Sequence, residues 1–329
     1  MLVPLTGPNA EVGRSIANAA NLALTDSGSD RVRISIYDTA GGAAAAANRA
    51  LAEGNRFFLG PLLAEDVRSI APVARAADVP VIAFSNDETV AGEGVYLMGF
   101  VPGQSIERVV TYARAKGVLR FAGLIPSGVY GERASRALAS AVERTGGRMV
   151  SVQTYIRSPA ALRASVARLN VSGGYDAVLI ADGSRIAAAA APAIRRGTSR
   201  GARILGTELW GAEADTAAQP SLDGAWFAAA SDGGFDQFSG RYRAQFRATP
   251  HRLASLGYDA VLMTVRVAAG WRAGQPFPEG ALRTQSFTGI DGPYRFWRDG
   301  IADRGLDVLE VRGGGVTTVS ASQNPGPQP

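Results

Sequence analysis

Cysteine is absent from this 329-residue chain, and histidine occurs once. Without cysteine there is no disulfide, no thiolate metal site and no thiol nucleophile, and this composition fits either side of a membrane. No apolar run approaches the ~18 residues of a transmembrane helix, and no charged segment with an apolar stretch precedes Leu2. The sequence therefore excludes thiol chemistry and gives no sign of a membrane-spanning helix.

Sequence signatures of catalysis are also missing. The single histidine, His251, lies in "ATPHRLASLGYDAV" at a helix start, and the chain has no Walker A loop. No G-x-G-x-x-G motif follows a strand, and no cluster of His and Cys offers a metal site. We therefore expect no enzyme activity, no cofactor and no metal.

The charge is positive, at +5 with a pI near 9.8, and almost every basic residue is Arg. These arginines are scattered singly along helices rather than gathered in a stripe. Because nucleic-acid binding needs a continuous basic footprint, we interpret the charge as a solvated surface and expect no nucleic-acid partner.

Short apolar runs alternate with long helical patterns, which is typical of parallel strands joined by crossover helices. The length fits two domains. The expected class is α/β. Strands are predicted at 32–37, 56–59, 79–83, 95–100, 120–125, 149–155, 177–181, 203–206 and 225–230, and helices at 10–26, 42–53, 64–77, 105–116, 131–145, 160–169, 184–196, 235–247 and 253–269.

The last sixty residues have a different, antiparallel pattern. Strands are predicted at 289–296, 306–312 and 316–320, separated by hairpin turns at Asp299-Gly300 and Gly313-Gly314-Gly315. The ending "NPGPQP" is rich in Pro and Gly, so residues 321–329 are expected to form a disordered tail.

Several phrases occur in a specific order: "PLTGPNAEVGRSIANAANLAL", "YDTAG", "FFLGPLLAEDVRSIAPVARAADVPVIAFSND", "GFVPGQSIERVVTYARAKG" and "YDAVLIADGS". As a series they resemble the type I periplasmic solute-binding proteins of the leucine/isoleucine/valine-binding family over nearly the whole chain. The resemblance implies two Rossmann-like lobes with parallel central sheets, joined by a three-segment hinge, with a ligand in the cleft between them. Lobe one would be 1–102 with 234–288, and lobe two 103–233 with 289–320.

On lobe one, the resemblance places ligand-binding positions in loops after strands. Ala64 stands where the family usually has a serine that binds the ligand carboxylate, and Ser85, Asn86 and Asp87 follow the strand at 79–83. Asp87 would repel a carboxylate and attract a cation, although a helix or turn cap explains it equally well. Val12 replaces an aromatic of some family members.

On lobe two, Tyr130 in "PSGVYGE" matches a family tyrosine that lines the cleft. Asp182 and Ser184 in "IADGS" lie at a strand end where the family often has an aromatic. Glu208 in "GTELWGAE" matches the acidic residue that pairs with the α-amino group of amino-acid ligands. Trp210 either covers the ligand or packs under its loop.

The resemblance implies a periplasmic receptor that captures a small polar, amino-acid-like ligand and delivers it to the membrane permease of an ABC transporter. The departures at Ala64 and Asp87 leave a modified, cationic or larger ligand open, and also a cleft that binds nothing. The alternative is a lipoprotein-type activator that docks on a penicillin-binding protein, because such activators resemble the same family. Under either interpretation the protein is expected in the periplasm, and lipid anchoring would use an N-terminal segment absent from this chain.

Overall fold

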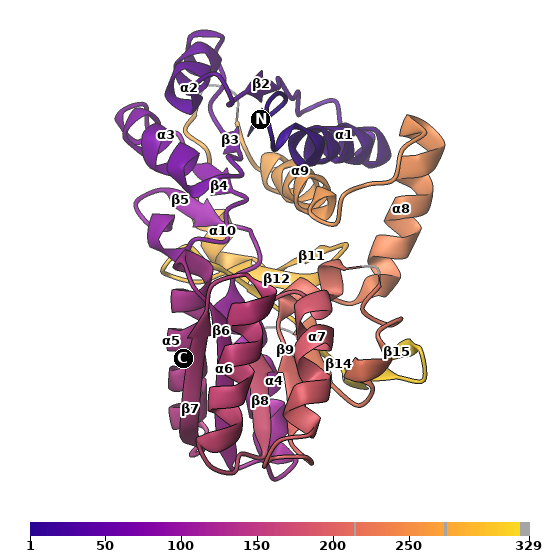
Figure 1. Cartoon of the computed structure of the whole chain (residues 1–329). Coiled ribbons are helices and arrows are strands. Elements are labelled where there is room, and N and C mark those ends of the chain that lie inside the picture. Colours follow the sequence, from indigo (N-terminus) through magenta and orange to yellow (C-terminus); the bar gives the residue numbers. More distant parts are fainter. Residues whose placement is uncertain (214, 273–274, 323–329) are drawn as a thin grey trace. The chain divides into compact units, whose positions relative to one another are not determined.

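The chain folds into two compact units in this computed structural model (Figure 1). The structure describes residues 1–213, 215–272 and 275–322. Unit 1 consists of Met1–Val101 and Ser231–Gly305, and unit 2 of Pro102–Ala230 and residues 306–322. The chain therefore passes from one unit to the other after Val101, Ala230 and Gly305. Both units mix helices with mainly parallel strands, so the predicted α/β class is confirmed.

The strands of unit 1 are short and buried on both faces. Consecutive residues contribute to two different hydrophobic clusters, as Val81 and Ile82 do on one strand and Val95 and Tyr96 on the next. Because successive side chains in a strand point to opposite faces, this alternation requires helices on both sides of the sheet. The strands are β1 (Leu2–Val3), β2 (Tyr37–Asp38), β3 (Phe58–Leu59), β4 (Val81–Ala83) and β5 (Val95–Leu97).

Helices cover both faces of these strands. One cluster packs α1 (Ala10–Ser27) and α9 (Ala254–Ala268) against the sheet, and the other packs α2 (Ala43–Ala52) and α3 (Ala64–Ala76). The strands β1 and β3 pass so closely that a Cβ added to Gly60 would lie 2.0 Å from the carbonyl oxygen of Leu2. The 3₁₀ helix η1 (Glu88–Val90), α8 (Asp232–Phe246) and α10 (Gly280–Thr284) also belong to unit 1.

A small antiparallel sheet also belongs to unit 1. It consists of β11 (Phe287–Gly289), β12 (Gly292–Phe296) and β13 (Ala302–Arg304). Phe287, Tyr294 and Phe296 pack into the same cluster as α1 and α9. This packing explains why 289–305 belongs to unit 1, whereas the sequence placed that stretch in the second lobe.

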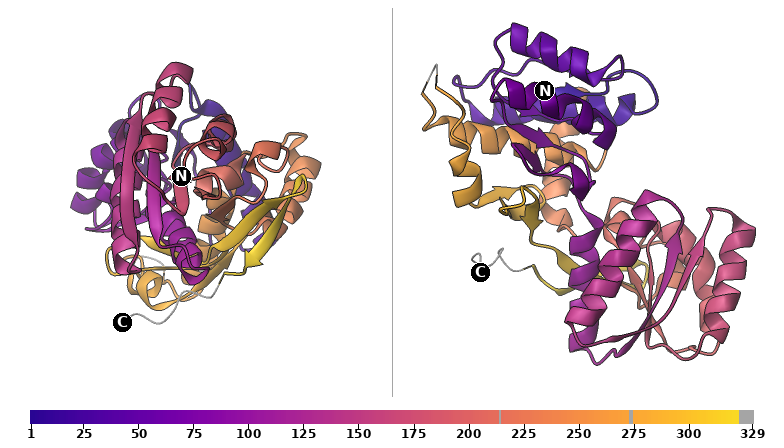
Figure 2. Two further views of the ribbon diagram at one scale, coloured as in Figure 1. Left: turned by 60° about the horizontal axis from the view of Figure 1, so that its bottom comes forward. Right: turned by 90° about the vertical axis from the view of Figure 1, so that its left-hand side faces the viewer.

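Unit 2 is built on one seven-stranded sheet in the order β15-β14-β10-β9-β8-β6-β7 (Figure 2). Its strands are β6 (Arg120–Pro126), β7 (Arg148–Tyr155), β8 (Ala177–Ile180), β9 (Arg203–Gly206), β10 (Trp226–Ala229), β14 (Asp307–Arg312) and β15 (Gly315–Ser320). The strands from β6 to β10 are parallel, and β14 and β15 are antiparallel to their neighbours.

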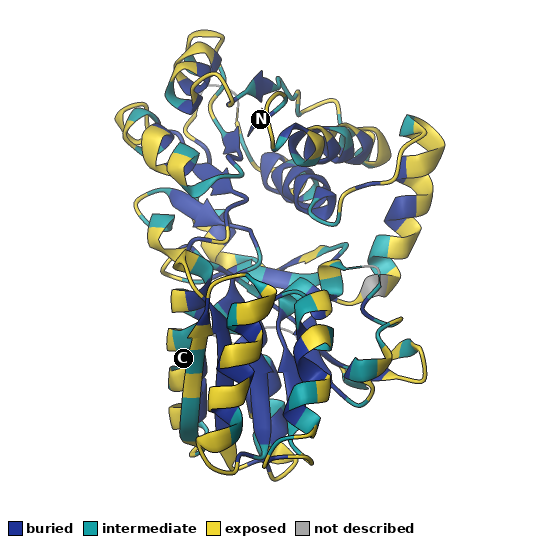
Figure 3. Cartoon of the chain, viewed as in Figure 1, coloured by how far each residue is buried: buried dark blue, intermediate teal, exposed yellow. Residues whose placement is uncertain are grey.

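Helices lie against this sheet with one side buried and the other exposed (Figure 3). The helices α6 (Pro159–Val171) and α7 (Ser184–Arg195) share a core with β6, β8 and β9, and α4 (Pro102–Ala115) and α5 (Val129–Arg144) contact the sheet as well. The 3₁₀ helices η2 (Glu208–Ala212) and η3 (Pro220–Leu222) follow β9. The order of parallel strands reverses between β6 and β8, so residues after these strands flank the position where α/β sheets bind ligands.

The main departures from the predicted elements are local. The strand predicted at 32–37 is reduced to β2, which pairs only with the two residues of β1. The strand predicted at 289–296 is a hairpin that turns at Ile290-Asp291, and Gly292 has a φ of 91°. The predicted turn at Asp299-Gly300 joins β12 to β13, and Gly313-Gly314 joins β14 to β15. The predicted tail lies, from residue 323, outside the described residues.

Candidate functional site

Glu208 is the centre of a polar cluster at the carboxyl end of the unit 2 sheet. Tyr130, in the first turn of α5, donates a hydrogen bond from its hydroxyl to Glu208 Oε1 over 2.9 Å and lies 3.0 Å from Thr207 Oγ1. Ser105 in α4 donates to Glu208 Oε2. The predicted pair Tyr130 and Glu208 thus meets, together with two hydroxyl residues that the sequence analysis did not select.

The electrostatics of this cluster follow from burial. Desolvation raises the pKa of Glu208, and the hydrogen bonds from Ser105 and Tyr130 oppose that rise. Burial, followed by the neighbouring Glu208 carboxylate, raises the pKa of Tyr130, which therefore remains a donor. A carboxylate held in this way suits a ligand ammonium, because ionisation becomes favourable when a cation arrives.

Asp182 has partners on three sides at the end of β8. Its Oδ2 accepts from the Tyr155 hydroxyl over 2.8 Å and from Arg157 Nε over 3.0 Å, and its Oδ1 accepts from the backbone N–H of Gly183. Only 6% of Asp182 is exposed. Its negative charge is therefore balanced within unit 2 by Arg157.

Ser184 begins α7 and is fully buried. Its backbone N–H and its hydroxyl both donate to Glu213 Oε2, over 2.9 and 2.5 Å. A carboxylate from the chain itself thus binds the N-terminus of this helix, where an anionic ligand would otherwise be favoured.

Trp210 packs in the core of unit 2 with 1% of its surface exposed. Its indole N–H donates to the carbonyl of Asp182 over 2.9 Å, and its ring lies on Gly206, where an added Cβ would approach to 2.3 Å. Of the two roles considered for Trp210, this geometry favours packing under the loop.

On unit 1, the loop after β1 is held by Asp38. Its carboxylate accepts from the backbone N–H of Leu5 over 2.8 Å and from the Thr6 hydroxyl over 2.7 Å, and these bonds lower its pKa to about 2. Ala64 is the first residue of α3, and the residue before it, Leu63, makes no side-chain cap bond. Ala64 therefore lies at a helix N-terminus, as expected.

Asp87 caps a turn and pairs with an arginine. Its Oδ1 accepts from the Thr89 backbone and hydroxyl, over 3.0 and 2.6 Å, and Arg68 of α3 binds its Oδ2 over 2.6 Å. Ser85 is buried and accepts from the Asp87 backbone N–H, whereas Asn86 is exposed. The capping role is thus present, and Arg68 balances the charge expected to attract a cation.

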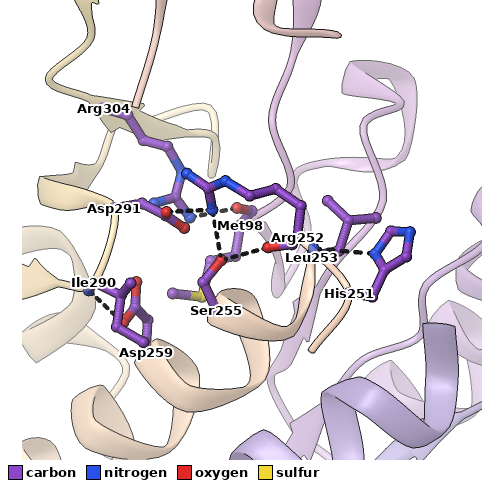
Figure 4. A network of polar contacts seen from close by, with 9 residues as sticks. All are labelled: Met98, His251, Arg252, Leu253, Ser255, Asp259, Ile290, Asp291 and Arg304. Atoms are coloured by element: carbon purple, nitrogen blue, oxygen red, sulfur yellow. Dashed lines mark hydrogen bonds and ion pairs between the residues drawn. The ribbon is translucent and has the colours of Figure 1, made fainter. Parts of the chain in front are cut away.

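Four charged residues form a second polar group in unit 1, named here the charge cluster: Asp259, Asp291 and Arg304, which are buried, and Arg252, whose side chain is 12% exposed (Figure 4). Arg252 donates to Asp291 Oδ1 over 2.6 Å, Arg304 donates to the carbonyl of Met98 over 2.6 Å, and Asp259 Oδ1 accepts from the Ile290 N–H over 2.8 Å. Burial, and then the Asp291 charge, raises the pKa of Asp259 to about 7. No predicted ligand residue belongs to the charge cluster.

The comparisons with known proteins agree on the fold. A family model described as periplasmic binding protein matches residues 1–315. An uncharacterised protein of Rickettsia prowazekii, RP748, is 24% identical over 180 residues, which cover 54% of this chain. The match spans 48% of that protein, so this chain covers about half of its relative's length.

Solved structures are similar over nearly the whole chain. A putative branched-chain amino acid ABC transporter protein from Rhodospirillum rubrum has a TM-score of 0.82 at 20% identity, covering 97% of this chain and 98% of that one. Full-length LpoA from Haemophilus influenzae has a TM-score of 0.75 at 17% identity, covering 97% of this chain and 58% of that one. At these identities the similarity establishes the fold alone.

Among the helices within residues 1–213, 215–272 and 275–322, none has both the length and the apolar character needed to cross a bilayer. Over the same ranges, no three side chains of His, Cys, Asp or Glu gather in a way that could hold a metal ion.

Proposed function

The chain belongs to the periplasmic binding protein family, and on that premise we propose that it is a receptor for a small ligand carrying a primary ammonium group. The observation that supports the proposal is the Glu208 cluster after β9, in which the hydroxyls of Ser105 and Tyr130 donate to one carboxylate and the Thr207 hydroxyl lies 3.0 Å from that of Tyr130. The family is described as one of binding proteins, in agreement with the expectation that this chain is not an enzyme.

In this proposal Glu208 binds the ligand ammonium, and Tyr130 orients the carboxylate. The loaded protein delivers the ligand to an ABC-type permease. Asp182 and Ser184 support the loops rather than bind the ligand, because Arg157 and Glu213 already occupy them.

A thermal-shift screen tests this function. The panel contains amino acids, polyamines, short peptides and peptidoglycan fragments, each tested on the native chain and on Glu208→Gln. A ligand at about 100 times its dissociation constant adds roughly 2.7 kcal/mol to the free energy of unfolding. We expect an amine to stabilise the native chain, and Glu208→Gln to weaken its binding by more than about tenfold because the ammonium loses its charged partner.

The second candidate is a protein that docks on a penicillin-binding protein. It is favoured by the internal partners of Asp87, Asp182 and Ser184, which are satisfied without any ligand. The similarity in fold to LpoA is compatible with it. A folded protein that no member of the panel stabilises, but that binds a purified penicillin-binding protein in surface plasmon resonance, would favour this candidate.

A further inference from the structure

Ser105 lies between two hydrogen-bond acceptors. It is fully buried in the first turn of α4, and its hydroxyl is within bonding distance of the Pro102 carbonyl, at 3.1 Å, and of Glu208 Oε2. A serine hydroxyl carries a single proton. Ser105 can therefore donate fully to only one of these two oxygens at a time.

One of these acceptors belongs to the start of unit 2. Pro102 is the first residue of unit 2 and the first residue of α4. Arg108 lies in α4 about one turn after Ser105. It donates to the carbonyl of Leu306 over 2.9 Å and to the Ser320 hydroxyl over 2.7 Å. Leu306 is the residue at which the chain enters unit 2 again. The helix that carries Ser105 thus begins one of the two segments of unit 2 and contacts the other.

We propose that Ser105 is a positioning residue for Glu208. Its hydroxyl group turns, and so donates its hydrogen bond either to Glu208 or to the Pro102 carbonyl, as the charge on Glu208 changes. An ionised carboxylate is a stronger acceptor than a carbonyl, so the Ser105 hydroxyl turns to Glu208 when that group is ionised. When a proton neutralises Glu208, the hydroxyl donates to Pro102 instead, whereas a ligand ammonium keeps Glu208 ionised and therefore keeps the hydroxyl on Glu208. The charge state of the site is thereby transmitted to the first residue of unit 2.

The surroundings of Glu208 fit this exchange. Tyr130 from α5 is the second donor to the carboxylate, and Asp182 with its partner Arg157 lies beyond Tyr130. Burial raises the pKa of Glu208, which brings its ionisation closer to neutral pH, and the Ser105 bond opposes the rise. Removing the hydroxyl should therefore shift the ionisation of Glu208 to higher pH.

Carbon-13 NMR on the full chain measures both ends of the exchange. The side-chain carboxyl carbon of Glu208, assigned by its loss in Glu208→Gln, reports ionisation. The Pro102 carbonyl carbon, observed through the N–H of Gly103, reports the hydrogen bond from Ser105. In the native chain we expect both signals to titrate with one common midpoint.

Three variants complete the experiment. Ser105→Ala should raise the Glu208 midpoint by about one pH unit, the equivalent of one lost hydrogen bond to a charged group, and should abolish the inflection at Pro102. Ser105→Thr keeps the hydroxyl and should preserve both signals, so the proposal remains testable if the alanine variant folds poorly. Ser165→Ala is the matched control, since Ser165 of α6 is equally buried but donates to the Thr154 carbonyl of β7.

A Glu208 midpoint that is the same in Ser105→Ala as in the native chain would overturn the proposal, as would a Pro102 carbonyl that does not follow Glu208. The role of the site in ligand capture rests on the proposed function, but the titration itself requires no ligand. If the carbonyl follows Glu208 while the ligand panel shows no binding, Ser105 positions Glu208 and the receptor function fails. If an amine binds while the carbonyl does not respond, the receptor function holds and the exchange fails.

Discussion

Replacing Asp259 with asparagine should make the protein more stable above neutral pH. Asp259 is 1% exposed and lies close to a second buried carboxylate, Asp291. Asparagine is nearly isosteric, and its side-chain oxygen can still accept from the Ile290 backbone N–H, as Asp259 Oδ1 does over 2.8 Å. The substitution therefore removes a buried charge and its repulsion from Asp291, and keeps the hydrogen bond.

The size of the effect follows from the pKa of Asp259. In the folded protein this pKa is about 7, against 3.8 for an ordinary aspartate. Between pH 4 and pH 7 the folded state therefore keeps a proton that the unfolded chain has lost, so stability falls as the pH rises through this window and is level above it. At about 1.4 kcal/mol per pH unit, the loss is on the order of 4 kcal/mol.

Asparagine avoids this loss but introduces an amide N–H₂ group. An unpaired buried donor costs about 1–3 kcal/mol, so the net gain at pH 8 should be about 1–3 kcal/mol. At pH 5, where Asp259 is already protonated, the variant should be no more stable than the native chain. The gain is therefore confined to the higher pH.

Calorimetric unfolding from pH 5 to pH 8 measures the difference between native chain and variant. Asp30→Asn serves as the control, because Asp30 is an exposed carboxylate of the same unit. The reasoning is refuted if the difference in free energy of unfolding between Asp259→Asn and the native chain is the same at every pH. It is also refuted if this difference favours the variant less at pH 8 than at pH 5.

Three further substitutions test other parts of the structure. Tyr130→Phe removes one donor to Glu208, so amine affinity measured by calorimetric titration should fall about tenfold; an unchanged affinity contradicts the role of this hydroxyl. Asp87→Asn weakens the pair with Arg68, and the free energy of unfolding should fall by about 1–3 kcal/mol in urea titration, with no loss expected if the pair is merely a surface contact. Gly60→Ala places a Cβ 2.0 Å from the Leu2 carbonyl at a φ of 92°, so the melting temperature should drop by more than about 5 °C; a stable variant would show that the two strands can separate.

The sequence predicted the fold well because both units follow simple periodicities. Runs such as Val81–Ala83 are apolar throughout, which indicates strands buried on both faces, and the helices between them are long enough to show their own period. The sequence predicted the third crossing between the units before residue 289, whereas it follows Gly305. The reason is that no local pattern in the antiparallel sheet from Phe287 to Arg304 indicates the core into which this sheet packs. The Asp291-Gly292 pair is, however, a hairpin signal that the sequence analysis did not use.

The site could be predicted only in part, because its partners are far apart in sequence. Tyr130 and Glu208 were selected from the family resemblance, and they meet in the structure. Ser105 lies 103 positions from Glu208, and no local pattern distinguishes it from other helical serines. Arg157 and Glu213 likewise have no motif, so the internal pairing of Asp182 and Ser184 becomes visible only once the strands are in place.

The most direct test of the receptor function is calorimetric titration of the native chain at pH 8 with the best-binding amine of the panel and with its deaminated analogue. L-Leucine and 4-methylpentanoate form one such pair. We expect the amine to bind more than about tenfold more tightly than its analogue, and Glu208→Gln to abolish this difference, because the ammonium contributes only when a carboxylate faces it. Equal affinities for the two compounds, or a preference that persists in Glu208→Gln, would contradict the assignment of Glu208 as the ammonium-binding residue.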